Sequence, residues 1–147
     1  MKLRMFRVLE PWPDTDHYNR LSRKGFRPQR LDGCELVEKD GVSMAGTQGE
    51  HQYMPHQFRD DVRSEAACRI TEKAIEDVVA GRIPKWEGTG NAWTTIILPD
   101  SVIFEYSIMD GEPGGKVGLE TYRRALEAWR DFLADESCDE RIVELPD

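Results

Sequence analysis

Apolar side chains recur every fourth residue through the middle of the chain, which is the spacing of one face of an α-helix. The residues on this spacing are Phe58, Val62, Ala66, Ile70, Ala74 and Val78, and the stripe is widened by Ala67, Ile75 and Val79. Gly81 suits the position just after a helix, and Pro84 cannot continue one. The pattern predicts one amphipathic helix over residues 57–80, with its apolar stripe on the core.

A second helical stripe lies near the C-terminus. Its apolar residues step by three or four positions: Leu119, Tyr122, Leu126, Trp129 and Leu133. Charged side chains fill the positions between them, as on the solvent face of a surface helix. This pattern predicts a second amphipathic helix over residues 119–134.

Two segments between these helices are rich in β-branched and aromatic residues, namely 93–98 (WTTIIL) and 102–108 (VIFEYSI). Pro99 and Asp100 between them suit a tight turn, so the two segments should form a hairpin. Val102, Phe104 and Tyr106 would then share one face. Shorter strands are expected at residues 2–9, 34–38, 116–117 and 141–143.

These elements predict an α+β fold. Strands joined by a short turn form an antiparallel sheet, and the two main amphipathic helices, about 57–80 and 119–134, should pack on one face of it. The chain has 147 residues, a length typical of one domain, so we expect a single domain over residues 1–147. Residues 14–33, with a short helical turn at Asp14–Asp16, and residues 43–56 are expected to be loops.

The charge of the chain is unevenly distributed. The net charge is −8, yet residues 1–32 carry a balance of +4 and residues 33–147 a balance of −12. A protein that binds duplex nucleic acid needs a basic surface, so we expect no nucleic-acid partner. An acidic surface instead suits a basic protein, because charge complementarity speeds encounter and selects the partner.

The basic start of the chain leaves two interpretations open. Its cations cluster at Arg20, Arg23, Lys24, Arg27 and Arg30. They could contact phosphates, or they could form a solvated loop or pair with the acidic remainder of the chain. The second interpretation is the simpler one.

Cysteine usage and hydropathy predict a cytoplasmic protein. Cys34, Cys68 and Cys138 are odd in number and far apart, which is typical of reduced thiols rather than a disulfide framework. Charges at Lys2, Arg4 and Arg7 interrupt the start of the chain, so no signal peptide is expected. Apolar runs such as residues 96–98 are too short to cross a bilayer, so we expect no membrane contact.

Motifs for catalysis are weak or missing. The glycine-rich segment 110–117 lacks the first glycine and the final Ser or Thr of a phosphate-binding loop. There is no G-x-S-x-G nucleophile motif. We therefore expect a protein that is not an enzyme and holds no cofactor.

One metal-binding alternative stays open at the 43–56 segment. His51 and His56 lie five residues apart with Glu50 beside them, but a zinc site needs a convergent third or fourth ligand. The alternative function is a small enzyme or ligand-binding domain with a pocket near residues 43–56. It would use His51, His56 and Glu50.

The stretch from Leu98 to Ala134 reads LPDSVIFEYSIMDGEPGGKVGLETYRRALEAWRDFLA. A hairpin with an acidic turn is followed by a glycine loop and then by Leu-Glu-x-x-x-x-Ala-Leu-x-x-Trp-x-x-Phe-Leu. This quarter of the chain resembles the end of small bacterial immunity proteins, the antitoxins of contact-dependent and other polymorphic toxin systems. The resemblance implies a small cytoplasmic protein that binds and blocks a toxin domain, often a nuclease.

The preferred hypothesis is a protein-binding inhibitor that occludes the basic cleft of a toxin domain. Tryptophan is enriched where proteins bind one another, and carboxylates suit a basic cleft. The contacts that we predict on this basis are Trp86, Asp100, Glu105, Asp110 and Glu112.

Overall fold

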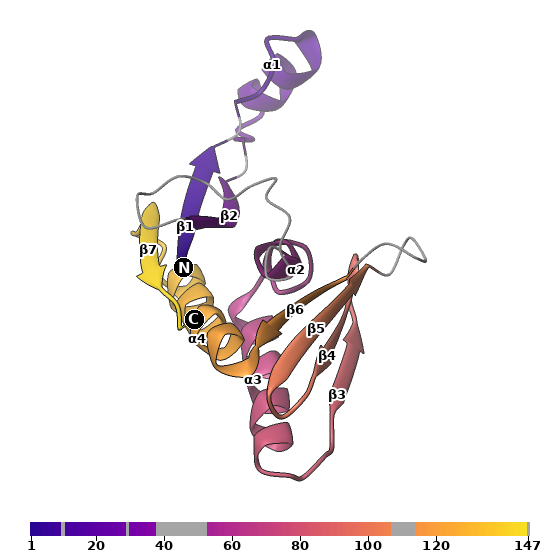
Figure 1. Ribbon diagram of the computed structural model, residues 1–147. Coiled ribbons are helices and arrows are strands. Elements are labelled where there is room, and N and C mark those ends of the chain that lie inside the picture. The colour runs from indigo at the N-terminus through magenta and orange to yellow at the C-terminus, as the bar shows by residue number, and fades with distance from the viewer. Residues whose placement is uncertain (10, 29, 38–52, 107–113, 147) are drawn as a thin grey trace.

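A computed structural model describes residues 1–9, 11–28, 30–37, 53–106 and 114–146. Its elements are, in chain order, β1 (Lys2–Leu9), α1 (Asp16–Arg23), β2 (Arg30–Val37), α2 (Tyr53–Asp61), α3 (Glu65–Val79), β3 (Trp86–Thr89), β4 (Trp93–Ile97), β5 (Ser101–Tyr106), β6 (Gly115–Gly118), α4 (Leu119–Ala134) and β7 (Glu140–Glu144). Figure 1 shows this arrangement. All strand pairs are antiparallel, so the predicted α+β class with antiparallel pairing is confirmed.

The strands form two sheets where the sequence predicted one. A three-stranded sheet has the order β2-β1-β7, and a four-stranded sheet has the order β3-β4-β5-β6. The first sheet joins the two ends of the chain, because Leu3 pairs with both Leu36 and Val143. No local period encodes such a long-range pairing, which is why the pattern of apolar residues could not separate the two sheets.

The predicted hairpin is the centre of the four-stranded sheet. Ile97 pairs with Val102, and the Leu98 N–H donates to the Ser101 carbonyl at 2.8 Å across the turn that holds Pro99. Trp93, Thr95 and Ile97 alternate with less buried residues along β4. This alternation places one face of the strand in the core.

Helices α2, α3 and α4 lie on one side of the four-stranded sheet (Figure 1). Helix α3 contacts β3 and β4, whereas α4 contacts β5 and β6 as well as β1 and β7 of the other sheet. Side chains from both sheets and these helices meet in one cluster, whose largest fully buried members are Trp129, Tyr122, Phe58, Phe104 and Phe132. Helix α4 therefore packs between the two sheets.

The prediction of one helix over residues 57–80 is wrong, because the chain breaks between α2 and α3. Ser64 caps the second helix, since its side chain accepts a hydrogen bond from the Ala67 N–H at 3.1 Å. The carbonyl of Val62, just before this cap, accepts a hydrogen bond from Trp129 Nε1 at 2.7 Å. In a continuous helix the Val62 carbonyl would accept a hydrogen bond from a backbone N–H. Here it accepts one from the Trp129 side chain in the core instead.

The break also rotates the apolar stripe. The buried residues of α3 are Cys68, Thr71, Ala74, Ile75 and Val78. Ile70 and Val79, which belonged to the predicted stripe, are 65% and 53% exposed. The four-residue apolar period runs through residues 62–64 in the sequence, but the helix does not, because α3 begins in a new orientation.

Three further segments differ from the sequence-based expectation. Residues 16–23 form a helix capped by Thr15, residues 30–33 extend β2, and residues 53–56 begin α2. Trp86 starts β3, a strand that was not predicted from the sequence. The predicted helix over residues 119–134 is confirmed with the same bounds.

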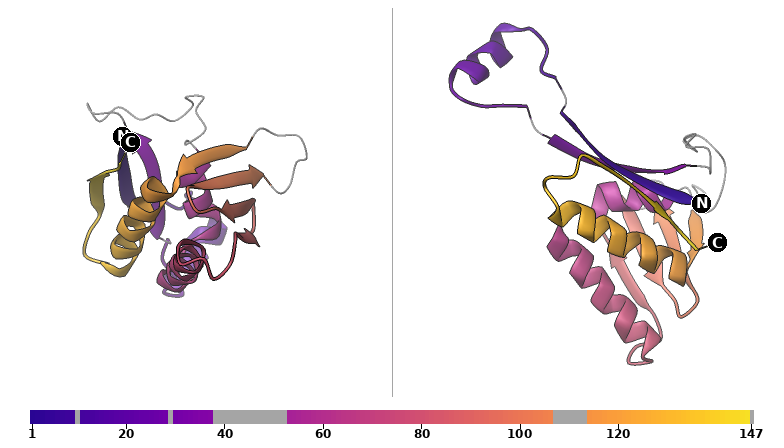
Figure 2. Two further views of the ribbon diagram at one scale, coloured as in Figure 1. Left: turned by 60° about the horizontal axis from the view of Figure 1, so that its bottom comes forward. Right: turned by 90° about the vertical axis from the view of Figure 1, so that its left-hand side faces the viewer.

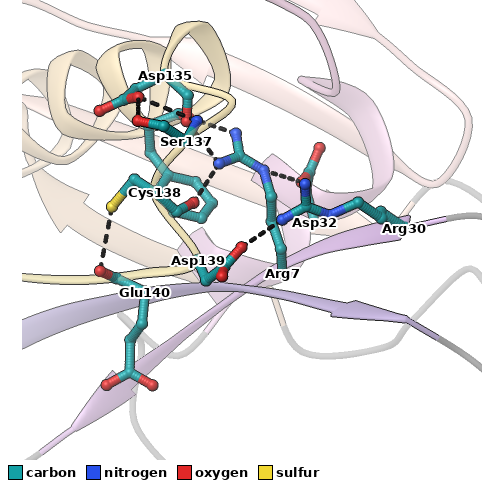
Figure 3. Close-up of polar contacts among 9 residues, drawn as sticks. Arg7, Arg30, Asp32, Asp135, Ser137, Cys138, Asp139 and Glu140 are labelled. Atoms are coloured by element: carbon teal, nitrogen blue, oxygen red, sulfur yellow. Dashed lines mark hydrogen bonds and ion pairs between the residues drawn. The ribbon is translucent and has the colours of Figure 1, made fainter.

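One buried cation fastens the three-stranded sheet to the end of α4. The Arg7 side chain is only 6% exposed, and its guanidinium lies 4.2 Å from the centre of the Phe132 ring. It donates to the carbonyls of Phe132 (2.5 Å), Asp135 (2.7 Å) and Cys138, and to the Asp32 carboxylate at 2.9 Å. Figure 3 shows this convergence. Arg7 therefore supplies a further donor to the carbonyls of Phe132 and Asp135, which also accept from the N–H groups of Asp135 and Cys138, and it ties the end of α4 to β1.

Two neighbouring arginines extend the same ionic arrangement. Arg4 bridges Glu35 at 2.8 Å and Glu140 at 3.0 Å, which lie on the strands flanking β1. Arg30 pairs with Asp139 (Figure 3). The cations of β1 and β2 thus pair with carboxylates on β2 and near β7.

Replacing Arg7 by Met should lower the free energy of unfolding by about 2–4 kcal/mol. The variant keeps a long apolar side chain but removes the Arg7 hydrogen bonds to the carbonyls of Phe132, Asp135 and Cys138 and to the Asp32 carboxylate. Replacing Arg30 by Met is the matched control and should cost no more than about 1 kcal/mol, because that ion pair is exposed. Urea unfolding at unchanged m-value measures both. Equal losses for the two variants would contradict the role of Arg7.

Candidate partner-binding surfaces

The four-stranded sheet leaves one face open. Across its strands Glu87 pairs with Ile96, Ile96 with Ile103, and Ile103 with Lys116. In the next row Thr89 pairs with Thr94 and Thr94 with Glu105. We call this surface the open sheet face: Glu87, Thr89, Thr94, Ile96, Ile103, Glu105 and Lys116.

No helix of the described residues covers the open sheet face. Figures 1 and 2 show α2, α3 and α4 on the opposite side of the sheet. Glu87, Glu105 and Lys116 are exposed, whereas Ile96 and Ile103 are only partly buried by their neighbours. The face therefore has an apolar centre with charged side chains around it.

A groove runs along the other side of β3, against α3. It has a volume of about 270 Å³, and its lining includes Trp86, Ile70, Ala67, Thr71 and Thr95. We call it the Trp86 groove. Gly88 lies next to the indole ring, because a Cβ added at Gly88 would lie 2.2 Å from Cη2 of Trp86. Glycine is therefore required for the indole to lie where it does.

The last residues of α2 hold the β3–β4 turn in place. The Asp61 carboxylate accepts hydrogen bonds from the N–H groups of Ala92 (3.1 Å) and Trp93 (2.9 Å). The Asp60 carboxylate accepts one from Trp93 Nε1 at 3.0 Å. The end of α2 thus anchors the β3–β4 turn and the start of β4.

The structure separates the contacts predicted from the sequence. Trp86 faces the core side of the sheet, whereas Glu105 belongs to the open sheet face, so the two lie on opposite sides. Asp100 is exposed in the β4–β5 turn. Asp110 and Glu112 lie outside the described residues. Strand register decides these positions, and the sequence alone did not supply it.

The alternative site near residues 43–56 is mostly outside the described part of the chain. Glu50 and His51 are not among the described residues, and His56 is exposed on α2. Cys34, a further conceivable ligand, is buried and donates to the Pro55 carbonyl at 3.3 Å. Within the described ranges, no group of three or more His, Cys, Asp or Glu side chains could hold a metal ion.

The three cysteines are free thiols in different surroundings. Cys34 and Cys68 are buried, and Cys138 is partly exposed. Burial raises the pKa of the Cys34 thiol well above its usual value and that of Cys68 to about 12. Neither buried thiol has the low pKa of a catalytic nucleophile.

The sequence pattern missed a second surface, at the turn of the β1–β2 ribbon. We call the segment from Val8 to Leu31 the basic arm. Figure 2 shows it projecting from the body with α1 at its far end. No residue of α1 is buried. The cation cluster was visible in the sequence, but the exposure of the apolar residues beside it was not.

Comparisons with family models, with curated proteins and with solved structures found no match to this chain. Among the described helices, none combines the length and the apolar character that a membrane span requires.

Thiol labelling should distinguish the cysteines. In the native protein we expect an aromatic disulfide reagent at neutral pH to label Cys138 about 100-fold faster than Cys34 or Cys68, because the two buried thiols react only after local opening. Mass spectrometry of the labelled peptides gives the three rates. In urea the rates should converge. Fast native labelling of Cys34 would contradict its burial.

Replacing Gly88 by Ala should displace the Trp86 indole and lower the free energy of unfolding by about 1–3 kcal/mol, because the new methyl group overlaps the ring. Gly118→Ser is the control, since the nearest atom to its Cβ is 3.9 Å away and serine can cap α4. Urea unfolding measures the stability of each variant. The contribution of Trp86 to the fluorescence is the difference between the spectrum of each variant and that of the same variant carrying Trp86→Phe. An unchanged fluorescence spectrum in Gly88→Ala would refute the described position of Trp86.

Proposed function

We propose that the protein is a protein-binding inhibitor of the immunity type, and that it binds a basic toxin domain through the open sheet face. The observation that carries this proposal is the apolar centre of that face. The solvated face of an antiparallel sheet is normally polar. Here Ile96 and Ile103 stand side by side in the two central strands and remain partly exposed.

The composition of the open sheet face is that of a protein interface. Interfaces commonly have an apolar centre and a polar rim. The two isoleucines supply the centre, and Glu87, Glu105 and Lys116 supply the rim. Thr89 and Thr94 share a hydrogen bond of 3.0 Å between their hydroxyls, so this part of the surface is already ordered before any partner binds.

Charge favours a basic partner over an acidic one. Residues 33–147, which contain the open sheet face, have a balance of −12. Nucleases collect basic side chains where they hold phosphates. A carboxylate-bearing sheet face can occupy such a cleft in place of a nucleic acid, and the long-range attraction would speed the encounter.

Inhibition would follow from occlusion alone. Glu87 and Glu105 lie at opposite ends of the two rows of the face, so they can meet cations on both sides of a cleft. Ile96 and Ile103 would exclude water from the contact between them. The inhibitor needs no catalytic group for this mechanism.

The test is affinity capture from the native host with four tagged chains. Wild type should retain a basic protein in stoichiometric amount, and salt should release it. Glu87→Lys/Glu105→Lys and Ile96→Thr/Ile103→Thr should each weaken retention about tenfold or more. Threonine keeps the β-branched shape that the strands prefer. Glu76→Lys, which changes an exposed carboxylate on α3, is the control and should retain the partner.

A growth assay separates inhibition from mere binding. The captured protein, expressed alone, should arrest growth, and wild type or Glu76→Lys should restore it. The two variants of the open sheet face should not restore growth. Capture of a protein that is harmless when expressed, or full protection by both face variants, would rule out the proposed function.

A further inference from the structure

The basic arm leaves the body of the protein at a defined point. Strand β7 pairs with β1 only as far as Phe6, whereas β2 pairs with β1 up to Leu9. Beyond Arg7 the β1–β2 ribbon therefore has two strands and carries α1 away from the core (Figure 2). The arm is held at its base by the Arg7 contacts and the Arg30–Asp139 pair, and none of its described residues is buried.

The helix at the end of the arm is fully formed although none of its residues is buried, and its Tyr18 ring packs on Trp12 of the same arm with the ring centroids 5.3 Å apart. Thr15 caps its start, and the Gly25 and Phe26 N–H groups donate to the Ser22 and Leu21 carbonyls at its end. This closing motif uses Gly25 with a positive φ of 90°. An eight-residue helix is marginal in water without tertiary contacts. A formed helix here is therefore suited to a partner's surface.

Exposed apolar side chains concentrate on the same arm. Leu9 is 61% exposed and Phe26 59%, and the cross-strand pair Val8 and Leu31 is also exposed. Large apolar residues exposed on one protrusion favour a protein partner, because interfaces bury such groups. They contribute nothing to holding phosphates.

Four cations of the arm remain unpaired, unlike Arg7 and Arg30 at its base. Among the residues that the structure describes, no carboxylate lies within ion-pair distance of these four: Arg20, Arg23, Lys24 and Arg27. Arg20 and Arg27 donate only to backbone carbonyls of the arm. A surface that complements these four cations and the exposed apolar residues beside them is acidic and partly apolar.

The open sheet face has this chemistry, because its exposed carboxylates Glu87 and Glu105 lie beside the two isoleucines. The ion pair of Glu87 with Lys85 is long, at 3.9 Å, and exposed. We infer that the basic arm of one copy docks on the open sheet face of a second copy, and that the second arm docks back in a two-fold symmetric dimer. Leu9 and Phe26 would cover Ile96 and Ile103, and the arm cations would meet Glu87 and Glu105. Such reciprocal contacts are the usual form of a symmetric dimer.

This inference shares the open sheet face with the proposed function but requires no toxin. If both hold, self-association and toxin binding compete for one surface, and a toxin releases the chain from its dimer. The two can fail separately, because self-association is measured on the purified chain alone.

Sedimentation velocity over a range of concentration and salt tests the dimer. Wild type should form a dimer at low salt that dissociates as salt is raised. The arm variant Arg20→Glu/Arg23→Glu/Lys24→Glu/Arg27→Glu and the face variant Glu87→Lys/Glu105→Lys should each raise the dimer dissociation constant at least about tenfold. Glu76→Lys should leave it unchanged. Circular dichroism checks that each variant is folded.

Charge exchange makes the test specific. A chain that carries the arm and face substitutions together should dimerise again, because both signs are reversed. A monomeric wild type, a dimer that survives both single-surface variants, or no recovery in the combined variant would overturn the inference. Copurification of nucleic acid that is lost only in the arm variant would overturn it in favour of a phosphate partner.

Discussion

The guanidinium of Arg7 is the contact on which the arrangement of the molecule most depends. It is buried at the end of β1 and donates to three carbonyls at and beyond the end of α4 and to Asp32 on β2. Three segments that are far apart in the sequence are thereby joined at one side chain. Helix α4 contacts both sheets, so the cation that fixes its end also fixes the three-stranded sheet against the core and sets the base of the basic arm.

Some charged side chains pair within the protein and hold its strands together, whereas others remain exposed on two surfaces. Arg4, Arg7 and Arg30 pair with carboxylates and hold β1, β2 and β7 together. Four cations of the basic arm have no carboxylate partner among the described residues, namely Arg20, Arg23, Lys24 and Arg27. The carboxylates of the open sheet face remain exposed. Two surfaces of opposite charge, each with apolar residues beside the charges, are left for contacts with other chains. A competition between them would be a simple way to keep a protein-binding face covered until its target is present.

Local periodicity predicted the helices and strands, whereas long-range strand pairing determined how they are arranged in space. The helix over residues 119–134 and the β4–β5 hairpin follow from patterns within a few residues of each other. The break at Val62–Ser64 was missed because the four-residue apolar period runs across it, although Ser64 itself is a capping residue. The separation of Trp86 from Glu105 depends on the register between β3, β4 and β5. Likewise, the exposure of Val8 and Leu9 depends on where β7 stops pairing with β1.

Carboxylate footprinting of the chain, free and bound to the protein that it captures, tests the central claim most directly. Glu87 and Glu105 should be modified in the free monomeric arm variant and protected in the complex, while Glu76 on α3 stays equally reactive in both. That result would place the partner on the open sheet face. Unchanged modification of Glu87 and Glu105 in the complex, with protection on another surface, would contradict it.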